Sequence, residues 1–252
     1  MIDYSDELKA QLTNAEKPGI NEYLTHLYGL VSDEVSNSEK ILEIGAGAGI
    51  SKKFLKKQNV FRTDLFNFPE NHVKGGVDSH ALLFAGKSYD STIAIDVLHH
   101  LKSPIDSLRE MKRVTNFKNG GSIVLIEPYV SLFSFPIYRI FHRERTSNPW
   151  SGQYSEPFSS HRPEDGNQSL SKLLFTKRVG QQLVSRLFPG ELYLVELHVF
   201  SVFSFFMTGG LSKPLPIPRK LVRLSFQLER LIPQALMRFI GSRCLIVIKE
   251  KI

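Results

Sequence analysis

The stretch Ile41-Leu-Glu-Ile-Gly-Ala-Gly-Ala-Gly49 decides the fold of this chain. Four mostly apolar residues, typical of a buried strand, run into a loop with glycine at every second position, and a helical pattern follows from Ser51. Glycine lets a loop turn tightly and lets a ligand approach its backbone, while the start of a helix presents unpaired N–H groups. The stretch therefore predicts a ligand-binding loop, and a plain turn between strand and helix is the alternative.

The spacing of the glycines separates two classes of ligand. A dinucleotide site needs glycine at the first, third and sixth positions of the loop, and the sixth position here is Ile50. An acid instead stands two residues before the first glycine, and this pattern resembles motif I of class I methyltransferases that use S-adenosylmethionine (SAM). The resemblance implies SAM as cofactor and S-adenosylhomocysteine as product. It also implies that the acid and the loop contact the methionine part of SAM, through Glu43, Gly45, Ala46, Gly47 and Gly49.

Further matches to this family follow in its order along the chain. Asp64 ends a strand-like run where the family places an acid on the ribose hydroxyls, and Asp78 resembles the acid that accepts from the adenine amino group. Residues 88–101, SYDSTIAIDVLHHL, resemble the fourth strand and turn of the subgroup containing the ubiquinone and menaquinone methyltransferases. The resemblance covers residues 39–128 and adds Leu65, Ser79 and Asp96 to the predicted cofactor contacts. Only 13 residues separate Asp64 from Asp78, so we expect the family's usual helix there to be missing.

Alternating strand and helix patterns define the fold class. Strand-like runs occupy residues 40–44, 59–63, 73–77, 89–96, 121–127, 192–200 and 243–249, and helical patterns occupy residues 19–35, 51–57, 105–115 and 170–187. Strands that alternate with helices predict an α/β fold with a parallel sheet. The resemblance implies a Rossmann-like class I methyltransferase fold, with a seven-stranded, mostly parallel sheet, an antiparallel last strand, helices on both faces and helical insertions.

We predict one methyltransferase domain over residues 1–252. Its parts are an N-terminal helical cap (1–38), a SAM-binding core (39–128), a substrate lid (129–169), a helix and strand that complete the sheet (170–208), a basic amphipathic insertion (209–242) and the last strand (243–252). The lid segment is rich in aromatic, proline, serine and charged residues, and an insertion of this length is typical of a functional loop.

Four residues are candidates for contact with the methyl acceptor. His100 follows the fourth strand beside His99, and this histidine pair is either a general base or a packing element. Glu127, Tyr129 and His142 lie at or beyond the end of the fifth strand, on the edge where open α/β sheets place ligands. Methyl transfer depends on alignment and desolvation more than on a strong base, so the sequence does not have to supply one.

The positive charge of the chain is concentrated in its last segment. Residues 209–252 hold nine Lys or Arg against two acids, in a chain of net charge +7. Within residues 219–240 one helical side carries Leu221, Leu224, Leu228, Leu231, Ile232, Ala235 and Phe239, while Arg219, Arg223 and Arg230 lie opposite. Such a helix either lies in an anionic membrane interface or packs on the core with a solvated basic face. Pro233 should kink or split it.

Composition limits the remaining classes. The only cysteine, Cys244, excludes a disulfide within the chain and any multi-cysteine metal site, and we expect no metal centre. The start of the chain is not a secretory signal and no spanning segment is evident, so we expect a cytoplasmic protein, peripheral at the inner face of the membrane if residues 219–240 bind lipid.

The predicted function is methylation of a small-molecule, glycan or lipid-linked acceptor, at oxygen. The aromatic clusters at residues 132–138 and 200–206 favour an apolar or lipid-linked acceptor, and a buried core is their alternative. Two further alternatives are a nucleic-acid methyltransferase and a non-catalytic, SAM-binding membrane-associated protein. No nucleic acid is expected as partner, because the chain has no NPPY-like tetrapeptide after the fourth strand and no recognisable RNA-binding module.

Overall fold

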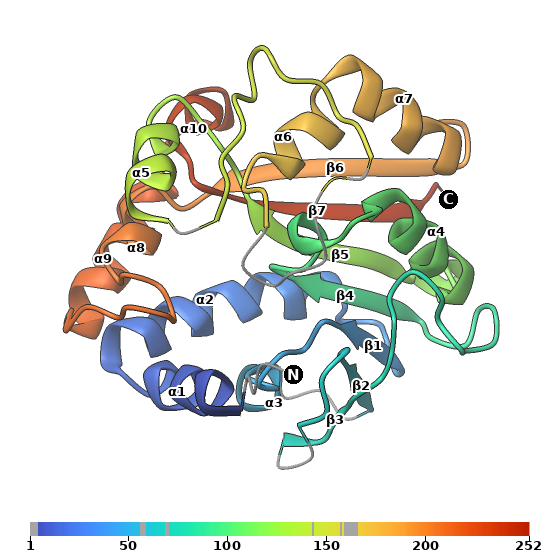
Figure 1. Ribbon diagram of the computed structural model, residues 1–252, viewed down its shortest axis with the longest axis horizontal. Coiled ribbons are helices and arrows are strands. Elements are labelled where there is room, and N and C mark those ends of the chain that lie inside the picture. Colours follow the sequence, from blue (N-terminus) through green and yellow to red (C-terminus); the bar gives the residue numbers. More distant parts are fainter. Residues whose placement is uncertain are drawn as a thin grey trace.

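One sheet organises the molecule. The computed structural model describes residues 5–55, 59–68, 71–142, 144–156, 158 and 166–251. Seven strands in these residues form a sheet of order β3-β2-β1-β4-β5-β7-β6, and all run parallel except β7, which is antiparallel to both β5 and β6 (Figure 1). The strands are β1 (Ile41–Ile44), β2 (Val60–Thr63), β3 (Val73–Lys74), β4 (Ser91–Ile95), β5 (Ser122–Pro128), β6 (Tyr193–Phe200) and β7 (Arg243–Glu250). This topology confirms the predicted fold class.

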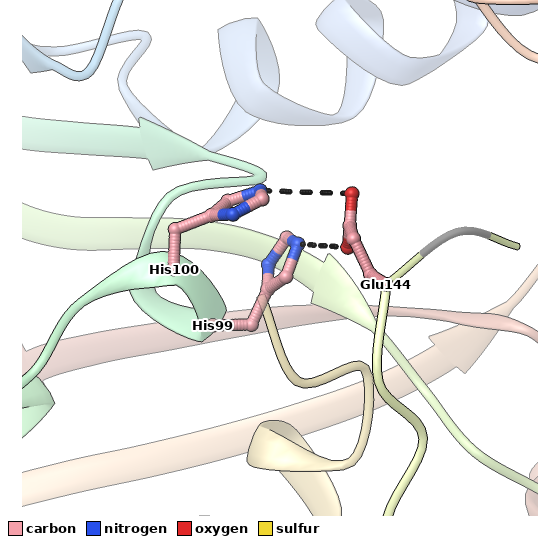
Figure 2. Close-up of side chains that lie close together, drawn as sticks. All are labelled: His99, His100 and Glu144. Atoms are coloured by element: carbon pink, nitrogen blue, oxygen red, sulfur yellow. Dashed lines mark ion pairs between the residues drawn. The ribbon is translucent and has the colours of Figure 1, made fainter. Parts of the chain in front are cut away.

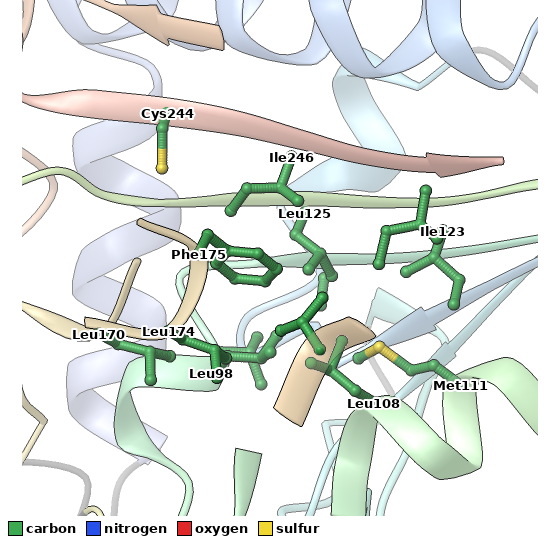
Figure 3. Close-up of a cluster of buried hydrophobic side chains, with 14 of the residues drawn as sticks. Leu98, Leu108, Met111, Ile123, Leu125, Leu170, Leu174, Phe175, Cys244 and Ile246 are labelled. Atoms are coloured by element: carbon green, nitrogen blue, oxygen red, sulfur yellow. The ribbon is translucent and has the colours of Figure 1, made fainter. Parts of the chain in front are cut away.

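Helices cover both faces of the sheet because its central strands are buried on both sides. Along β5, Ile123 and Leu125 face one hydrophobic cluster while Val124 and Ile126 face the other. The first cluster is closed by α4 (Pro104–Val114), α6 (Leu170–Phe175) and α7 (Arg178–Leu187), and Figure 3 shows side chains of α4 and α6 against β5 and β7. The second is closed by α1 (Ser5–Ala15), α2 (Pro18–Glu34), α3 (Ser51–Phe54) and α9 (Arg219–Glu229).

Several elements differ from the sequence prediction in length. The helix predicted over residues 170–187 is two helices, α6 and α7, which approach so closely that a Cβ on Gly180 would lie 2.3 Å from the carbonyl oxygen of Leu173. The strand predicted over residues 73–77 ends at Lys74, because two glycines follow it. Residues 56 and 57 of the helix predicted over 51–57 lie outside the described part, and α3 covers Ser51–Phe54. As expected, no α-helix stands between Asp64 and Asp78 in the residues described there.

A group of short helices lies at the carboxyl edge of the parallel strands. α5 (Ser134–Phe141) follows β5, α8 (Phe203–Phe206) follows β6, and α10 (Gln234–Ile240) precedes β7. Figure 1 shows these helices with α9 along one side of the molecule. Pro233 separates α9 from α10 and so splits the predicted amphipathic helix, as expected. Within the described ranges, no helix has both the length and the apolar composition to cross a bilayer.

Candidate active site

The glycine loop follows β1 and has the backbone geometry that its residues predict. Gly45, Gly47 and Gly49 have φ values of 66°, 52° and 69°, in the left-handed region that favours glycine. A Cβ on Gly45 would lie 2.4 Å from a methyl of Val97, so the turn after β4 packs directly on the loop. A Cβ on Gly47 would meet nothing within 4 Å. The loop therefore presents its backbone to open space at Gly47, where a ligand can approach it.

Asp64 braces this loop from the end of β2. Its Oδ2 accepts the N–H of Gly47 at 2.8 Å, and its Oδ1 accepts the N–H of Phe66 at 3.0 Å. Leu65 beside it is 58% exposed. The carboxylate thus stands next to the backbone that faces the open space, and its contact with the ribose stays a prediction.

The predicted adenine-binding residues lie alongside the predicted ribose acid although the usual helix is missing. Backbone N–H groups of Gly76 and Val77 donate to the carbonyls of Leu65 and Asp64, both at 3.0 Å. These bonds hold the segment that carries Asp78 and Ser79 against the end of β2. Ser79 is buried, whereas Asp78 is exposed and accepts from the ring Nδ1 of His80 at 2.7 Å.

Glu43 is buried beneath the loop in a small polar network. Its carboxylate accepts the Ser51 hydroxyl, and the Arg62 guanidinium lies 3.5 Å away while donating to Ser51 Oγ at 2.7 Å. Burial raises the pKa of Glu43 to about 7, against the opposing effects of Ser51 and Arg62. Sequence reasoning missed Arg62, although parallel pairing of β1 with β2 places it directly opposite Glu43.

Asp96 directly follows β4, with a strained backbone and a buried partner. Its φ is 57°, and its Oδ1 lies 2.6 Å from Nη2 of Arg243 at the start of β7. Arg243 is buried, and its guanidinium carbon also lies 5.2 Å from the centre of the Phe205 ring. Burial alone would lower the pKa of the Arg243 guanidinium. The charge of Asp96 outweighs burial, so the pKa of Arg243 is raised. Sequence spacing gives no indication of this pair, because the two residues come from distant parts of the chain.

Glu127 holds the turn after β4. The fully buried carboxylate accepts the backbone N–H groups of Val97, Leu98 and His99 at 3.1, 2.8 and 3.3 Å, and the ring Nδ1 of His99 at 2.6 Å. Burial alone would raise the pKa of Glu127. The charge and the hydrogen bonds of His99 outweigh burial, so the pKa of Glu127 is lowered. In this arrangement Glu127 positions His99, and its predicted contact with the acceptor stays a prediction.

His99 and His100 meet Glu144 of the segment that follows α5 (Figure 2). Glu144 lies 3.3 Å from Nε2 of His99 and 3.9 Å from Nε2 of His100. Burial opposes the charge of His99, but Glu127 and Glu144 together raise its pKa to about 10. The N–H of Asn167 also donates to the carbonyl oxygen of His99 at 2.9 Å. Residues from the predicted lid are therefore fastened to the turn after β4.

The two remaining candidates, His142 and Tyr129, lie on the same edge of the sheet but in different surroundings. The ring of His142, directly after α5, lies 5.3 Å from that of Tyr138; burial lowers the pKa of His142 against the charges of Glu144 and Asp96. Burial raises the pKa of Tyr129 to about 12, and Nζ of Lys172 lies 4.9 Å from the centre of its ring. The structure thus brings His100 and His142 together around Glu144, whereas Tyr129 packs beside α6.

Comparison with known proteins identifies the family of this chain. The model of a family described as a methyltransferase domain matches residues 5–185. The chain therefore belongs to this family and is a class I SAM-dependent methyltransferase, as its motifs implied. No curated protein matches the chain.

Two solved structures share the fold over most of their length. One is a SAM-dependent methyltransferase, possible histamine N-methyltransferase, from Thermotoga maritima, with 13% identity over 98% of this chain and 97% of that chain and a TM-score of 0.58. The other is a SAM-dependent methyltransferase from Archaeoglobus fulgidus, with 14% identity over 91% of this chain and 94% of that chain and a TM-score of 0.51. At these identities the similarity concerns the fold alone.

Proposed function

We propose that this enzyme transfers the methyl group of SAM to an oxygen of a lipid-linked acceptor, such as a lipid-linked glycan, at an anionic membrane surface. The S–CH3 bond of SAM breaks, an O–CH3 bond forms, S-adenosylhomocysteine leaves and the acceptor hydroxyl loses its proton. A surface of exposed apolar side chains on the same edge of the sheet as the glycine loop and the histidine cluster carries this proposal.

The proposed roles follow the geometry of that edge. Cofactor contacts are assigned to the glycine loop and its acids, namely Glu43, Gly45, Ala46, Gly47, Gly49, Asp64, Leu65, Asp78, Ser79 and Asp96. His100 and His142 are assigned to the acceptor side, where Glu144 lies close to both. Residues 129–169 are assigned as the acceptor lid, because Glu144 and Asn167 contact the turn after β4.

The apolar surface is built from four helices and the residues beside them. It comprises Leu132, Phe133, Ile140, Phe141, Phe203, Leu221, Leu224, Leu228, Leu231, Leu236 and Phe239, all at least 37% exposed. Direct contacts join its parts: the rings of Phe133 and Phe203 lie 5.7 Å apart, and the N–H of Phe133 donates to the carbonyl oxygen of Phe239. Single exposed leucines are ordinary on protein surfaces, but a contiguous apolar group of this size marks an interaction site.

α9 does not pack on the protein through its leucine stripe, which is formed by Leu224, Leu228 and the following Leu231. It packs through a different face. Val222, Phe226 and Glu229 are buried, whereas Leu224, Leu228 and the following Leu231 are 48%, 57% and 79% exposed. Glu229 fixes this orientation, since its Oε1 accepts the N–H groups of Val202, Phe203 and Ser204 at the start of α8. The sequence left open that these leucines pack on the core. Their exposure does not fit that alternative.

An anionic bilayer fits this surface because exposed cations border it. Lys220, Arg230 and Arg238 are exposed on α9 and α10, and Arg139 is exposed on α5. Arg223 is less available, since it is bound to Glu22 of α2 at 2.8 Å. Interfacial helices place apolar side chains at the acyl boundary and cations among the anionic head groups. Each such cation adds about 1 kcal/mol to the free energy of membrane binding.

Vesicle sedimentation tests the membrane part of the proposal. Binding to vesicles of phosphatidylcholine with phosphatidylserine should fall as salt rises, because salt screens the attraction. Changing Lys220, Arg230 and Arg238 together to Gln should weaken binding at low salt without altering the melting temperature. Absence of binding to anionic vesicles at low salt would contradict the proposal. Burial of this surface in a dimer in solution would also contradict it.

Methyl transfer to membrane extracts tests the acceptor. With SAM labelled in its methyl group, label should enter the organic phase of a lipid extract and resist mild alkali, as an ether does and an ester does not. Mass spectrometry of the labelled species then identifies the methylated atom. Label confined to aqueous small molecules or to nucleic acid would refute a lipid-linked acceptor while leaving the SAM-dependent chemistry in place.

A further inference from the structure

The cluster of His99, His100 and Glu144 has the composition of a metal site. Two imidazole nitrogens and a carboxylate oxygen converge there, and the three ligand atoms lie within 4.8 Å of one another (Figure 2). Two histidines and a glutamate are a known ligand set of catalytic zinc sites, which use three protein ligands and leave a fourth position open. We propose that His99, His100 and Glu144 bind a divalent transition-metal ion, zinc by preference.

The spacing of the donor atoms suits such an ion. Bonds of about 2.0 to 2.2 Å in a tetrahedral site place ligand atoms roughly 3.3 to 3.5 Å apart. Nε2 of His99 and Oε2 of Glu144 are separated by 3.3 Å, and Nε2 of His100 and Oε1 of Glu144 by 3.9 Å. The first distance already matches a tetrahedral site, and the more exposed His100 ring has to move closer to complete it.

Glu127 supports the site from behind. Its carboxylate accepts the Nδ1–H of His99 at 2.6 Å, which directs Nε2 of the same ring toward Glu144. A carboxylate on the second nitrogen of a ligating histidine is the usual outer partner in protein zinc sites, where it fixes the orientation of the ring. Three backbone N–H groups hold Glu127 itself in place. His99 and its outer partner are thus in place, and metal binding releases to solvent the proton that Nε2 of His99 shares with Glu144.

The position of the cluster suggests a use for the ion. It combines the turn after β4, which packs on the glycine loop through Val97, with the lid segment after α5. An ion with an open position there can bind an acceptor oxygen and lower the pKa of its hydroxyl, which would activate that oxygen for methyl transfer. This last step rests on the proposed function, whereas metal binding does not.

Metal titration of the untagged, chelator-treated protein tests the site. We expect one equivalent of Zn²⁺ to bind in competition with a chromophoric chelator and to raise the melting temperature. Co²⁺ should give the absorption bands of a tetrahedral site, whereas Mg²⁺ should not compete, because imidazole suits transition metals. Loss of a ligand in Glu144→Gln or His100→Ala should weaken Zn²⁺ affinity by about 100-fold or more.

His198→Ala is the matched control, since this histidine is exposed on β6, away from the cluster. Melting temperature and binding of S-adenosylhomocysteine show whether each variant is folded. Binding of less than one equivalent by the wild type would overturn the site, as would equal Zn²⁺ affinity in Glu144→Gln and His198→Ala. Metal binding without any effect on methyl transfer would keep the site and remove its catalytic use, independently of whether the acceptor is lipid-linked.

Discussion

The proposed donor side and the proposed acceptor side of this enzyme are built in different ways. On the donor side, a backbone loop is braced by residues from neighbouring parallel strands, as when Asp64 accepts the N–H of Gly47. On the acceptor side, the contacts join distant segments, as when Glu127 of β5 and Glu144 of the segment after α5 meet His99. The proposed donor side therefore depends on the shape of a backbone loop, whereas the proposed acceptor side depends on charged side chains brought together from distant segments.

Removing the charge of Glu127 should give the largest effect on stability. Glu127→Gln places an amide among groups that donate to a carboxylate, and loss of one partner from a buried ion pair costs about 3 kcal/mol or more. Urea denaturation measures the free energy of unfolding. In the control Glu110→Gln, which breaks a partly exposed pair with Arg113, the cost should stay below about 1 kcal/mol. Equal costs would show that the buried contacts of Glu127 contribute no more than a partly exposed ion pair does.

A side chain at Gly47 should abolish SAM binding while leaving the acceptor side intact. In Gly47→Val, the new side chain enters the open space over the loop and has to adopt a φ of 52°. We expect calorimetry to show an affinity for SAM at least about 100-fold weaker, or about 2.7 kcal/mol. Gly190→Val is the control, because a Cβ there meets nothing within 4 Å and the residue lies in an exposed turn. Unchanged affinity in Gly47→Val would show that the ligand lies elsewhere.

Polar residues in the leucine stripe should affect membrane binding alone. Leu224, Leu228 and Leu231 changed together to Gln should lower partitioning into anionic vesicles by about tenfold or more, since burying a leucine in the interface contributes on the order of 1 kcal/mol. The control changes Leu83, Leu192 and Leu194, which are 94%, 56% and 42% exposed outside the apolar surface. Both variants should bind SAM normally. A similar loss in both would mean that general hydrophobicity, and not this surface, drives binding.

The smallest effect concerns the pH dependence of SAM binding. Burial raises the pKa of Glu43 to about 7, so its carboxylate takes up a proton as pH falls through neutrality. If the ionised form attracts the SAM amino group, affinity should decrease between pH 8 and pH 6, by less than about tenfold per pH unit. In Glu43→Gln this pH dependence should be absent. A wild-type affinity that stays level over this range would separate Glu43 from the ligand.

The same pKa shift has the opposite sign for the stability of the protein without ligand. Because the folded state binds this proton more tightly than the unfolded state does, the contribution of Glu43 is fully present below about pH 4.5 and is lost as pH rises through about 7. Unfolding free energies of the wild type and Glu43→Gln over this range check the sign.

The proposed cofactor residues could be assigned from sequence because they form a motif in which strand, glycines and acids follow one another from Glu43 to Asp78. The structure confirms the sheet in which these strands lie, and the cofactor contacts themselves stay a prediction. Glu144 and Arg243 could not be assigned, because no spacing rule connects them to His99 or Asp96. The leucine stripe was visible in the sequence, but the side on which α9 packs depends on Glu229 capping α8, a tertiary contact.

The position of β7 has a consequence for the order of events during synthesis. β7 lies between β5 and β6, so β5 has only β4 as a partner, and β6 has none, until residues 243–250 have emerged from the ribosome. Until then β5 presents an unpaired apolar edge, which is a template for aggregation. The same late strand brings Arg243 to Asp96, beside the cofactor loop. A nascent chain stalled before β7 would therefore need protection by a chaperone, and its donor site would lack the cation that neutralises Asp96.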